Sequence, residues 1–238
     1  MAQFVLVHGI TCGAWTYKPV TERLRAAGHD VYPITSTGVA ERAHLNGPHV
    51  NLDTHIQDVV NTFTWNDITD AVLVGHSYGG MVITGAADRI PERIKALVYL
   101  DAFLPENGKA VLDLALPERS AAMWKTVAEK GNGWFLPPLA ATAYGAIDDP
   151  NLIAWIESKC TPQPFATLSQ PIRLTGAWAK VPRKMYILAE KYDPSPFQGF
   201  AGKLRGDNAW TVHNLPGTHF LSLLCPDQTT ELLVEAAR

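Results

Sequence analysis

The chain has 238 residues, of which 47% are hydrophobic and 18% charged, and its net charge is −3 at neutral pH. This composition is typical of one soluble globular domain that is long enough to bury a core, and the absence of a Lys/Arg run argues against nucleic acid and anionic membranes as partners. The three widely spaced cysteines form no C-x-x-C pair and no apolar stretch reaches about 18 residues, so we expect a cytoplasmic protein without a disulfide framework.

Apolar, β-branched runs alternate with amphipathic stretches along the chain. Strands that are apolar on both faces and separated by helices indicate a parallel sheet covered on both sides, and the right-handed crossover rule makes it an open, doubly wound α/β sheet. We predict strands at residues 3–8, 30–34, 71–74, 94–100, 184–189 and 210–215, and helices at about 17–27, 52–63, 78–88, 197–205 and 229–237.

The interval between residues 104 and 181 interrupts this alternation. It is rich in Trp and Pro, shows no clear strand, and has helical patterns only near 121–130 and 152–158. Loops that follow the strands of a parallel sheet surround its ligand crevice. We therefore predict a core formed by residues 1–104 and 181–238, with residues 105–180 inserted as a small, mostly helical cap over that crevice.

A Gly-His-Ser-Tyr-Gly pentapeptide at residues 75–79 follows the third predicted strand and opens a predicted helix. In a G-x-S-x-G turn of this kind the serine is held at a sharp strand-to-helix bend, where it serves as a nucleophile. The flanking glycines let strand and helix pass closely. We predict that Ser77 is the catalytic nucleophile.

A serine nucleophile needs a general base later in the chain, because the order in this arrangement is serine, acid, histidine. His219 follows the last predicted strand in a loop at the catalytic edge and is the predicted base, whereas His213 lies inside that strand and is expected to be structural. His76 is expected to pack under the turn that holds Ser77. His8 is expected to brace the loop that follows it at the end of the first strand. The remaining histidines are expected at the surface or in loops; they are His29, His44, His49 and His55.

The acid that orients the base has more than one candidate. Asp101 directly follows the strand after the nucleophile strand, and Asp193 lies in the loop after the next strand. The second loop is the usual place for the acid, but Asp193 stands four residues beyond the strand end and precedes a proline. The sequence favours Asp101, keeps Asp193 as the alternative, and leaves Glu190 as a weaker candidate.

The oxyanion of an acyl-transfer reaction needs two backbone N–H donors. One should come from Tyr78, directly after the nucleophile, and the other from Ile10, in the loop after the first strand. The residues expected to line the substrate pocket are Gly9, Cys12, Phe103, Trp124, Trp134 and Phe220.

Together these motifs resemble the α/β-hydrolases, and more closely the group of plant methylesterases, hydroxynitrile lyases and short bacterial esterases. The residues that carry the resemblance are 4–9 with 13–15, 26–31, 75–81, 217–219 and Pro226. The lyases of this group have Thr where this chain has Gly9 and Lys where it has Phe220, so the resemblance favours an esterase. Residues 37–44 and 51–55, and the presence of Asp101, are similar to bacterial members.

We therefore expect a serine hydrolase that cleaves a small hydrophobic or aromatic carboxylic ester, carbamate or lactone through an acyl-enzyme. No metal or organic cofactor is expected, and the oligomeric state stays open, with a homodimer as one option. The alternatives are a lyase acting on cyanohydrins and a ligand-binding receptor on the same fold. Cys12 is either a filler of the oxyanion loop or a thiol that makes the enzyme sensitive to alkylation.

Overall fold

A six-stranded, wholly parallel sheet forms the centre of the protein, in the order β2-β1-β3-β4-β7-β8. The computed structural model describes residues 1–145 and 147–238; residue 146 falls inside the predicted cap and lies outside the described part. The sheet strands are β1 (Gln3–Val7), β2 (Asp30–Ile34), β3 (Ala71–His76), β4 (Ile94–Leu100), β7 (Arg183–Ala189) and β8 (Trp210–Leu215). The predicted doubly wound α/β sheet is confirmed.

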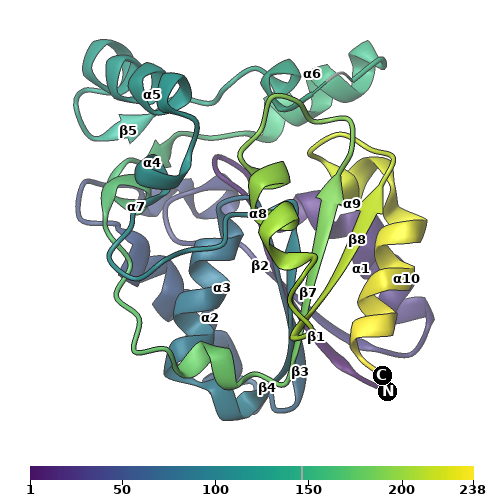
Figure 1. Ribbon diagram of the computed structural model, residues 1–238. Helices are drawn as coiled ribbons and strands as arrows, with labels where there is room; N and C mark the ends of the chain where they lie inside the picture. Colours follow the sequence, from purple (N-terminus) through teal and green to yellow (C-terminus); the bar gives the residue numbers. More distant parts are fainter. Residues whose placement is uncertain (146) are drawn as a thin grey trace.

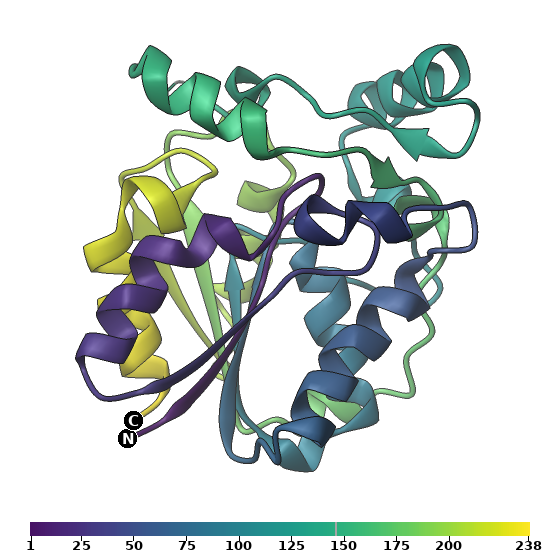
Figure 2. The same cartoon turned by 180° about the vertical axis from the view of Figure 1, so that it is seen from behind.

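Helices cover both faces of this sheet, as the two opposite views show (Figures 1 and 2). On one face α1 (Lys18–Ala26) packs beside α10 (Pro226–Ala236), and on the other α2 (Leu52–Trp65) packs beside α3 (Gly79–Arg89). α8 (Phe197–Leu204) lies against β7 and β8. Because both faces are covered, every residue of β3 is buried.

Short local signals set the helix ends. α2 begins with a capping box in which the Asn51 side chain accepts from the Thr54 N–H at 3.0 Å and the Thr54 hydroxyl accepts from the Asn51 N–H at 3.3 Å. α10 begins at Pro226, three residues before the predicted start, because proline is well suited to the first helical turn.

The segment between β4 and β7 contributes the elements that lie beyond the carboxyl ends of the strands. α5 (Pro117–Lys130), α6 (Pro150–Lys159) and the short antiparallel pair of β5 (Phe135–Leu136) and β6 (Gln163–Pro164) lie above the sheet edge in Figure 1. The prediction of no strand in this segment was therefore wrong: two-residue strands, one containing proline, are too short to show periodicity. The shorter helical elements of the chain are α4 (Val111–Leu114), α7 (Ala166–Ser169), α9 (Leu221–Leu224), and the 3-10 turns η1 (Ala14–Tyr17), η2 (Ala40–Leu45), η3 (Pro91–Arg93), η4 (Ala141–Tyr144) and η5 (Ala177–Lys180).

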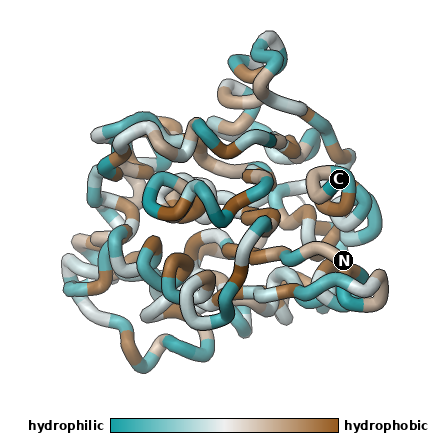
Figure 3. The backbone as a smooth tube through the Cα atoms, turned by 90° about the horizontal axis from the view of Figure 1, so that it is seen from below, coloured by the Kyte–Doolittle hydropathy of each residue, from teal (hydrophilic) through white to brown (hydrophobic). Residues whose placement is uncertain are grey.

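The last part of this inserted segment leaves the carboxyl edge and returns along the core. α7 packs against α2, and η5 packs against α3. The segment is thus joined to the core at more than its two ends. Seen from below, hydrophobic stretches run through the interior and hydrophilic stretches occupy much of the periphery (Figure 3). Within the described residues, no helix combines the length and the apolar character needed to span a bilayer.

Candidate active site

Ser77 lies on a strained turn between β3 and α3. Its φ is +55°, a left-handed conformation that is uncommon for a residue with a side chain. Glycine is required on both sides, because a Cβ at Gly75 would lie 2.6 Å from the Gly79 carbonyl oxygen and one at Gly79 would lie 2.7 Å from the Val7 carbonyl oxygen. The Ser77 carbonyl accepts a hydrogen bond from the Phe103 N–H at 3.0 Å, which fixes the turn against the chain beyond β4.

His219 and Asp101 form a buried polar pair beside this turn. His219 Nδ1 lies 2.6 Å from Asp101 Oδ2, and Asp101 Oδ1 accepts from the Ala189 N–H at 3.0 Å. The Asp101 N–H donates to the Ile187 carbonyl at 2.7 Å, so the carboxylate is held by the ends of both β4 and β7. With Nδ1–H donating to the carboxylate, the lone pair of the imidazole is at Nε2.

Burial acts on the charges of this pair. It lowers the pKa of His219, and the positive Arg119 acts in the same direction. Burial raises the pKa of Asp101, while the Ala189 N–H and His76 oppose that rise. A neutral imidazole is the form that can accept a proton from serine, and the short hydrogen bond offsets part of the cost of a buried carboxylate.

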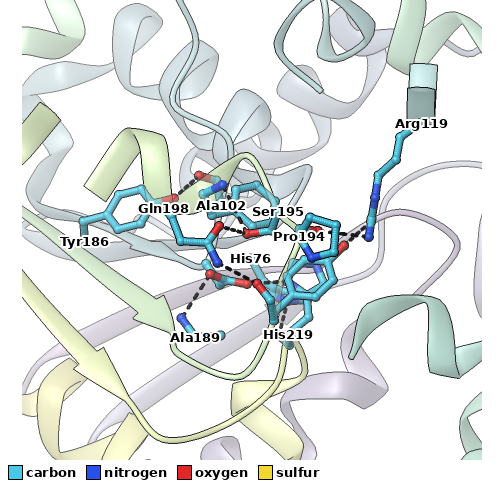
Figure 4. Close-up of polar contacts among 12 residues, drawn as sticks. His76, Ala102, Arg119, Tyr186, Ala189, Pro194, Ser195, Gln198 and His219 are labelled. Atoms are coloured by element: carbon cyan, nitrogen blue, oxygen red, sulfur yellow. Dashed lines mark hydrogen bonds and ion pairs between the residues drawn. The ribbon is translucent and has the colours of Figure 1, made fainter. Parts of the chain in front are cut away.

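Aromatic side chains enclose the His219 ring. The Phe197 ring stacks at 5.3 Å and 9°, and the Tyr192 ring lies at 4.6 Å. Arg119 reaches from α5 to the hydroxyl of Tyr192 and to the Pro194 carbonyl, the latter at 3.3 Å (Figure 4). The inserted segment therefore places a positive charge near His219 through the loop that follows β7.

The loop after β1 is oriented by His8. Its Nε2 accepts from the Ser36 N–H at 3.0 Å, so Nδ1 carries the proton and donates to the Gly9 carbonyl at 2.6 Å. In a trans peptide the N–H points opposite to the carbonyl. Holding the Gly9 carbonyl therefore aims the Ile10 N–H the other way, and among the described residues that N–H has no acceptor.

The Tyr78 N–H is the second candidate donor and also has no acceptor among the described residues. The Tyr78 hydroxyl donates to His55 Nδ1 at 3.0 Å, while His55 Nε2 donates to the Thr37 carbonyl at 2.8 Å. The expectation of a surface or loop His55 was wrong, because α2 turns it fully into the core. Its position one helical turn before the apolar Val59 was the signal that could have placed it on the buried face.

A small cavity lies directly beside Ser77. Its volume is about 10 Å³. The structure brings Ser77 and His219 together in its wall with four predicted residues and two that were not predicted to line it. The predicted four are Gly9, Ile10, Cys12 and Phe220, and the other two are His76 and Tyr144.

Three residues expected in the pocket lie outside this cavity. Phe103 is buried three residues beyond the end of β4, where its ring packs edge-on against Phe197 of α8 at 5.1 Å. Trp124 is 54% exposed on α5 and packs edge-on against Phe165, and Trp134 contacts Phe135. Aromatic content did not reveal which way these side chains point.

The two other acid candidates are both exposed. Asp193 lies on the surface of the loop after β7, and Glu190 accepts from the Asn214 side chain at 3.1 Å. Neither contacts His219 in the described part of the chain. The geometry therefore pairs His219 with Asp101 and leaves Asp193 without a place in the site.

Comparison with known proteins assigns the family. The model of the alpha/beta hydrolase family matches residues 4–232. The chain belongs to the α/β-hydrolase family. It is 42% identical to the carbendazim hydrolyzing esterase of Nocardioides sp. (strain SG-4G) over 98% of each chain. It is also 36% identical to the alpha-hydroxynitrile lyase of Arabidopsis thaliana, over only 44% of this chain and 41% of that one.

Among solved structures, this α/β-hydrolase is similar to an extracellular α/β-hydrolase from a Paenibacillus species. The TM-score is 0.88, the sequence identity is 23%, and each chain is covered completely. At that identity the likeness shows the fold alone. The predicted family and fold are confirmed by these comparisons.

Two positions bear on the lyase alternative in this α/β-hydrolase. A Cβ at Gly9 would lie 3.0 Å from the Ser77 Cβ and 3.1 Å from His76 Nδ1, so a threonine there would crowd the nucleophile. Phe220 is buried in the cavity wall and carries no ammonium group. Within the described residues, no group of three or more His, Cys, Asp or Glu side chains could hold a metal ion.

Proposed function

We propose that this α/β-hydrolase is a serine esterase that hydrolyses small hydrophobic or aromatic esters, including carbamates, through an acyl-enzyme. The observation that carries the proposal is Ser77 on its strained turn, sharing a cavity with a His219 whose Nδ1 is 2.6 Å from the buried Asp101. The carbamate part is supported by the relative that hydrolyses carbendazim, a carbamate.

The first half of the reaction acylates the serine. His219 Nε2 takes the hydroxyl proton of Ser77, and Oγ attacks the carbonyl carbon of the ester. The oxyanion that forms is stabilised by the Ile10 and Tyr78 N–H groups, the second of which lies at the N-terminus of α3. The intermediate collapses when His219 donates its proton to the leaving alcohol.

The second half releases the acyl group. Water enters the position left by the alcohol, His219 removes its proton, and the resulting hydroxide attacks the acyl carbon. Ser77 leaves and recovers its proton from His219. Throughout the cycle Asp101 keeps the imidazole in one tautomer and stabilises its cationic form.

The test is steady-state hydrolysis of p-nitrophenyl acetate and of methyl N-phenylcarbamate by the wild type and by Ser77→Ala. We expect multiple turnovers that Ser77→Ala abolishes, with Ser158→Ala, at an exposed serine of α6, as the matched control. Turnover that persists in Ser77→Ala would contradict the proposal. Cyanide release from mandelonitrile without ester hydrolysis would favour the lyase, and tight binding without turnover would favour a receptor.

A further inference from the structure

The cavity beside Ser77 is too small for the proposed reaction as it stands. Its volume of about 10 Å³ holds roughly one water molecule, whereas an ester needs room for groups on both sides of the carbonyl. Some part of the wall must move before a substrate reaches Ser77. The wall on the side of the inserted segment is Tyr144, at the end of η4.

Tyr144 also borders a second hollow, the cap groove, between α5 and η4. The cap groove has a volume of about 280 Å³. Ala122, Met123 and Leu139 contribute apolar walls, and Arg119 lies at the groove as well. Among the described residues Tyr144 alone lines both spaces, so moving its side chain would connect them.

The contacts of Tyr144 allow its side chain to move while its backbone stays. Its carbonyl accepts from the His219 N–H at 3.2 Å, which anchors the backbone to the loop of the proposed base. Its hydroxyl is buried and has no hydrogen-bond partner in the described part of the chain. The ring is held by packing, stacked on His219 at 5.6 Å and edge-on to Phe220 at 5.4 Å. Rotation about the side-chain bonds therefore breaks no hydrogen bond, whereas moving the loop would break one.

The position of the ring indicates which part of the substrate would enter the cap groove. His219 gives its proton to the leaving group, so the leaving alcohol must lie beside His219. The Tyr144 ring stacks on the same imidazole. We propose that the cap groove binds the leaving alcohol of the ester, an uncharged alkyl or aryl group, and that Tyr144 swings aside to admit it. This inference rests on the proposed esterase function. It adds that the cap groove selects the substrate by its leaving alcohol.

Acetates that differ only in the alcohol test the groove, because all form the same acetyl-enzyme and share its hydrolysis. Ala122→Trp fills the groove, and Ala128→Trp makes the same change on an exposed part of α5 outside it. We expect Ala122→Trp to lower the ratio of kcat/KM for 1-naphthyl acetate to that for ethyl acetate by about tenfold, since burial of an aromatic group is lost. Ala128→Trp should keep the wild-type ratio. An unchanged ratio in Ala122→Trp overturns the groove assignment.

Two phosphorylating reagents with leaving groups of different size test the movement of Tyr144. With diethyl p-nitrophenyl phosphate or diethyl fluorophosphate, Ser77 Oγ bonds to phosphorus, the bond from phosphorus to p-nitrophenolate or fluoride breaks, and the hydroxyl proton passes to His219, so both leave the same diethylphosphoryl group on Ser77. We expect Tyr144→Ala to raise the rate for the p-nitrophenyl reagent relative to that for the fluoride, because its aryl leaving group can then enter the cap groove without displacement of the ring. Tyr144→Phe keeps the ring and should keep the wild-type ratio. A ratio that falls or stays constant in Tyr144→Ala contradicts the gate.

Binding of 1-naphthol, followed by its fluorescence, separates this inference from the proposed function. It needs no catalysis, so it reports on the groove even if the wild type hydrolyses neither acetate. Weaker binding in Ala122→Trp than in Ala128→Trp supports the groove independently of the esterase. If the wild type hydrolyses esters but the two variants bind naphthol equally, the esterase proposal is retained and the groove assignment is contradicted.

Discussion

Asp101 combines two features that a residue at a strand end rarely has together. It is fully buried, and its φ is +45°. The backbone is held by the bond to the Ile187 carbonyl, and the side chain by the Ala189 N–H and by His219. A carboxylate in this position can accept hydrogen bonds only, which matches the part of an acid that orients a histidine.

Replacing Asp101 by Asn removes the charge and allows the wrong imidazole tautomer. We expect kcat for p-nitrophenyl acetate to fall by about 10³–10⁴-fold in Asp101→Asn, the size of effect known for triad acids. Asp193→Asn, the matched change at an exposed carboxylate, should leave kcat within about threefold. Steady-state kinetics of both variants measure this, and a large loss confined to Asp193→Asn would assign the acid to the other loop.

Arg119 affects the pH dependence of the site, and comparing the wild type with a variant at this position tests the effect. Burial lowers the pKa of His219, and the positive Arg119 lowers it further because it disfavours the imidazolium. A base must be neutral, so activity is lost as the pH falls through this pKa. In Arg119→Gln the repulsion is gone, the pKa of His219 rises, and the acid limb of kcat/KM should move to higher pH. An acid limb that moves to lower pH would contradict this electrostatic account.

The chemistry-bearing residues were predictable from sequence to the extent that motif and position define them. Ser77 and His219 follow from a pentapeptide and from a loop after the last strand. Tyr144 and Arg119 could not be predicted, because they come from the inserted segment, where no regular alternation relates sequence position to orientation. The positions of Trp124 and Trp134 outside the cavity beside Ser77 could not be predicted for the same reason: bulk and apolarity indicate burial or contact, but not the direction of a side chain.

At the scale of elements, the loop after β1 depends on a side chain that does not touch the reacting atoms. His8 holds the Gly9 carbonyl and so aims the Ile10 N–H. We expect His8→Leu to lower kcat by about 10²-fold with little change in KM, since a misdirected oxyanion donor is lost in the transition state only. His44→Leu, at an exposed histidine, is the control. A rise in KM at constant kcat would show that His8 serves substrate binding instead.

The elements of the core were predictable because their signals are long. β2, β4 and β8 have the predicted bounds, and β1, β3 and β7 differ by one or two residues at an end. The pair of β5 and β6 was missed because each has two residues, a single period of alternation, which is too short to form a recognisable pattern. Local sequence patterns therefore defined the sheet better than the segment between β4 and β7.

On the scale of the whole molecule, the sheet is the rigid base that brings residues far apart in sequence to one edge. Asp101 and His219, 118 residues apart, meet because the carboxyl ends of β4, β7 and β8 are neighbours. Parallel strands place all such ends at the same edge. The precision of the site thus depends on the packing of the buried strands.

Truncation of a central strand tests that dependence. Leu97 in β4 is fully buried, and we expect Leu97→Ala to lower the free energy of unfolding by about 2–5 kcal/mol through lost burial and a cavity. Leu45→Ala, at a side chain that is 41% exposed, should change it by less than about 0.5 kcal/mol. Urea unfolding followed by tryptophan fluorescence measures both, and equal effects would show that the sheet core is not tightly packed.

The central claim is that Ser77 carries the acyl group during turnover. The most direct measurement is mass spectrometry of the protein quenched during reaction with p-nitrophenyl N,N-dimethylcarbamate, whose carbamoyl-enzyme should hydrolyse slowly, followed by peptide mapping. The account predicts one dimethylcarbamoyl group per chain on the peptide that contains Ser77, and none in Ser77→Ala. Hydrolysis without any covalent intermediate, or modification of a different residue such as Cys12, would contradict it.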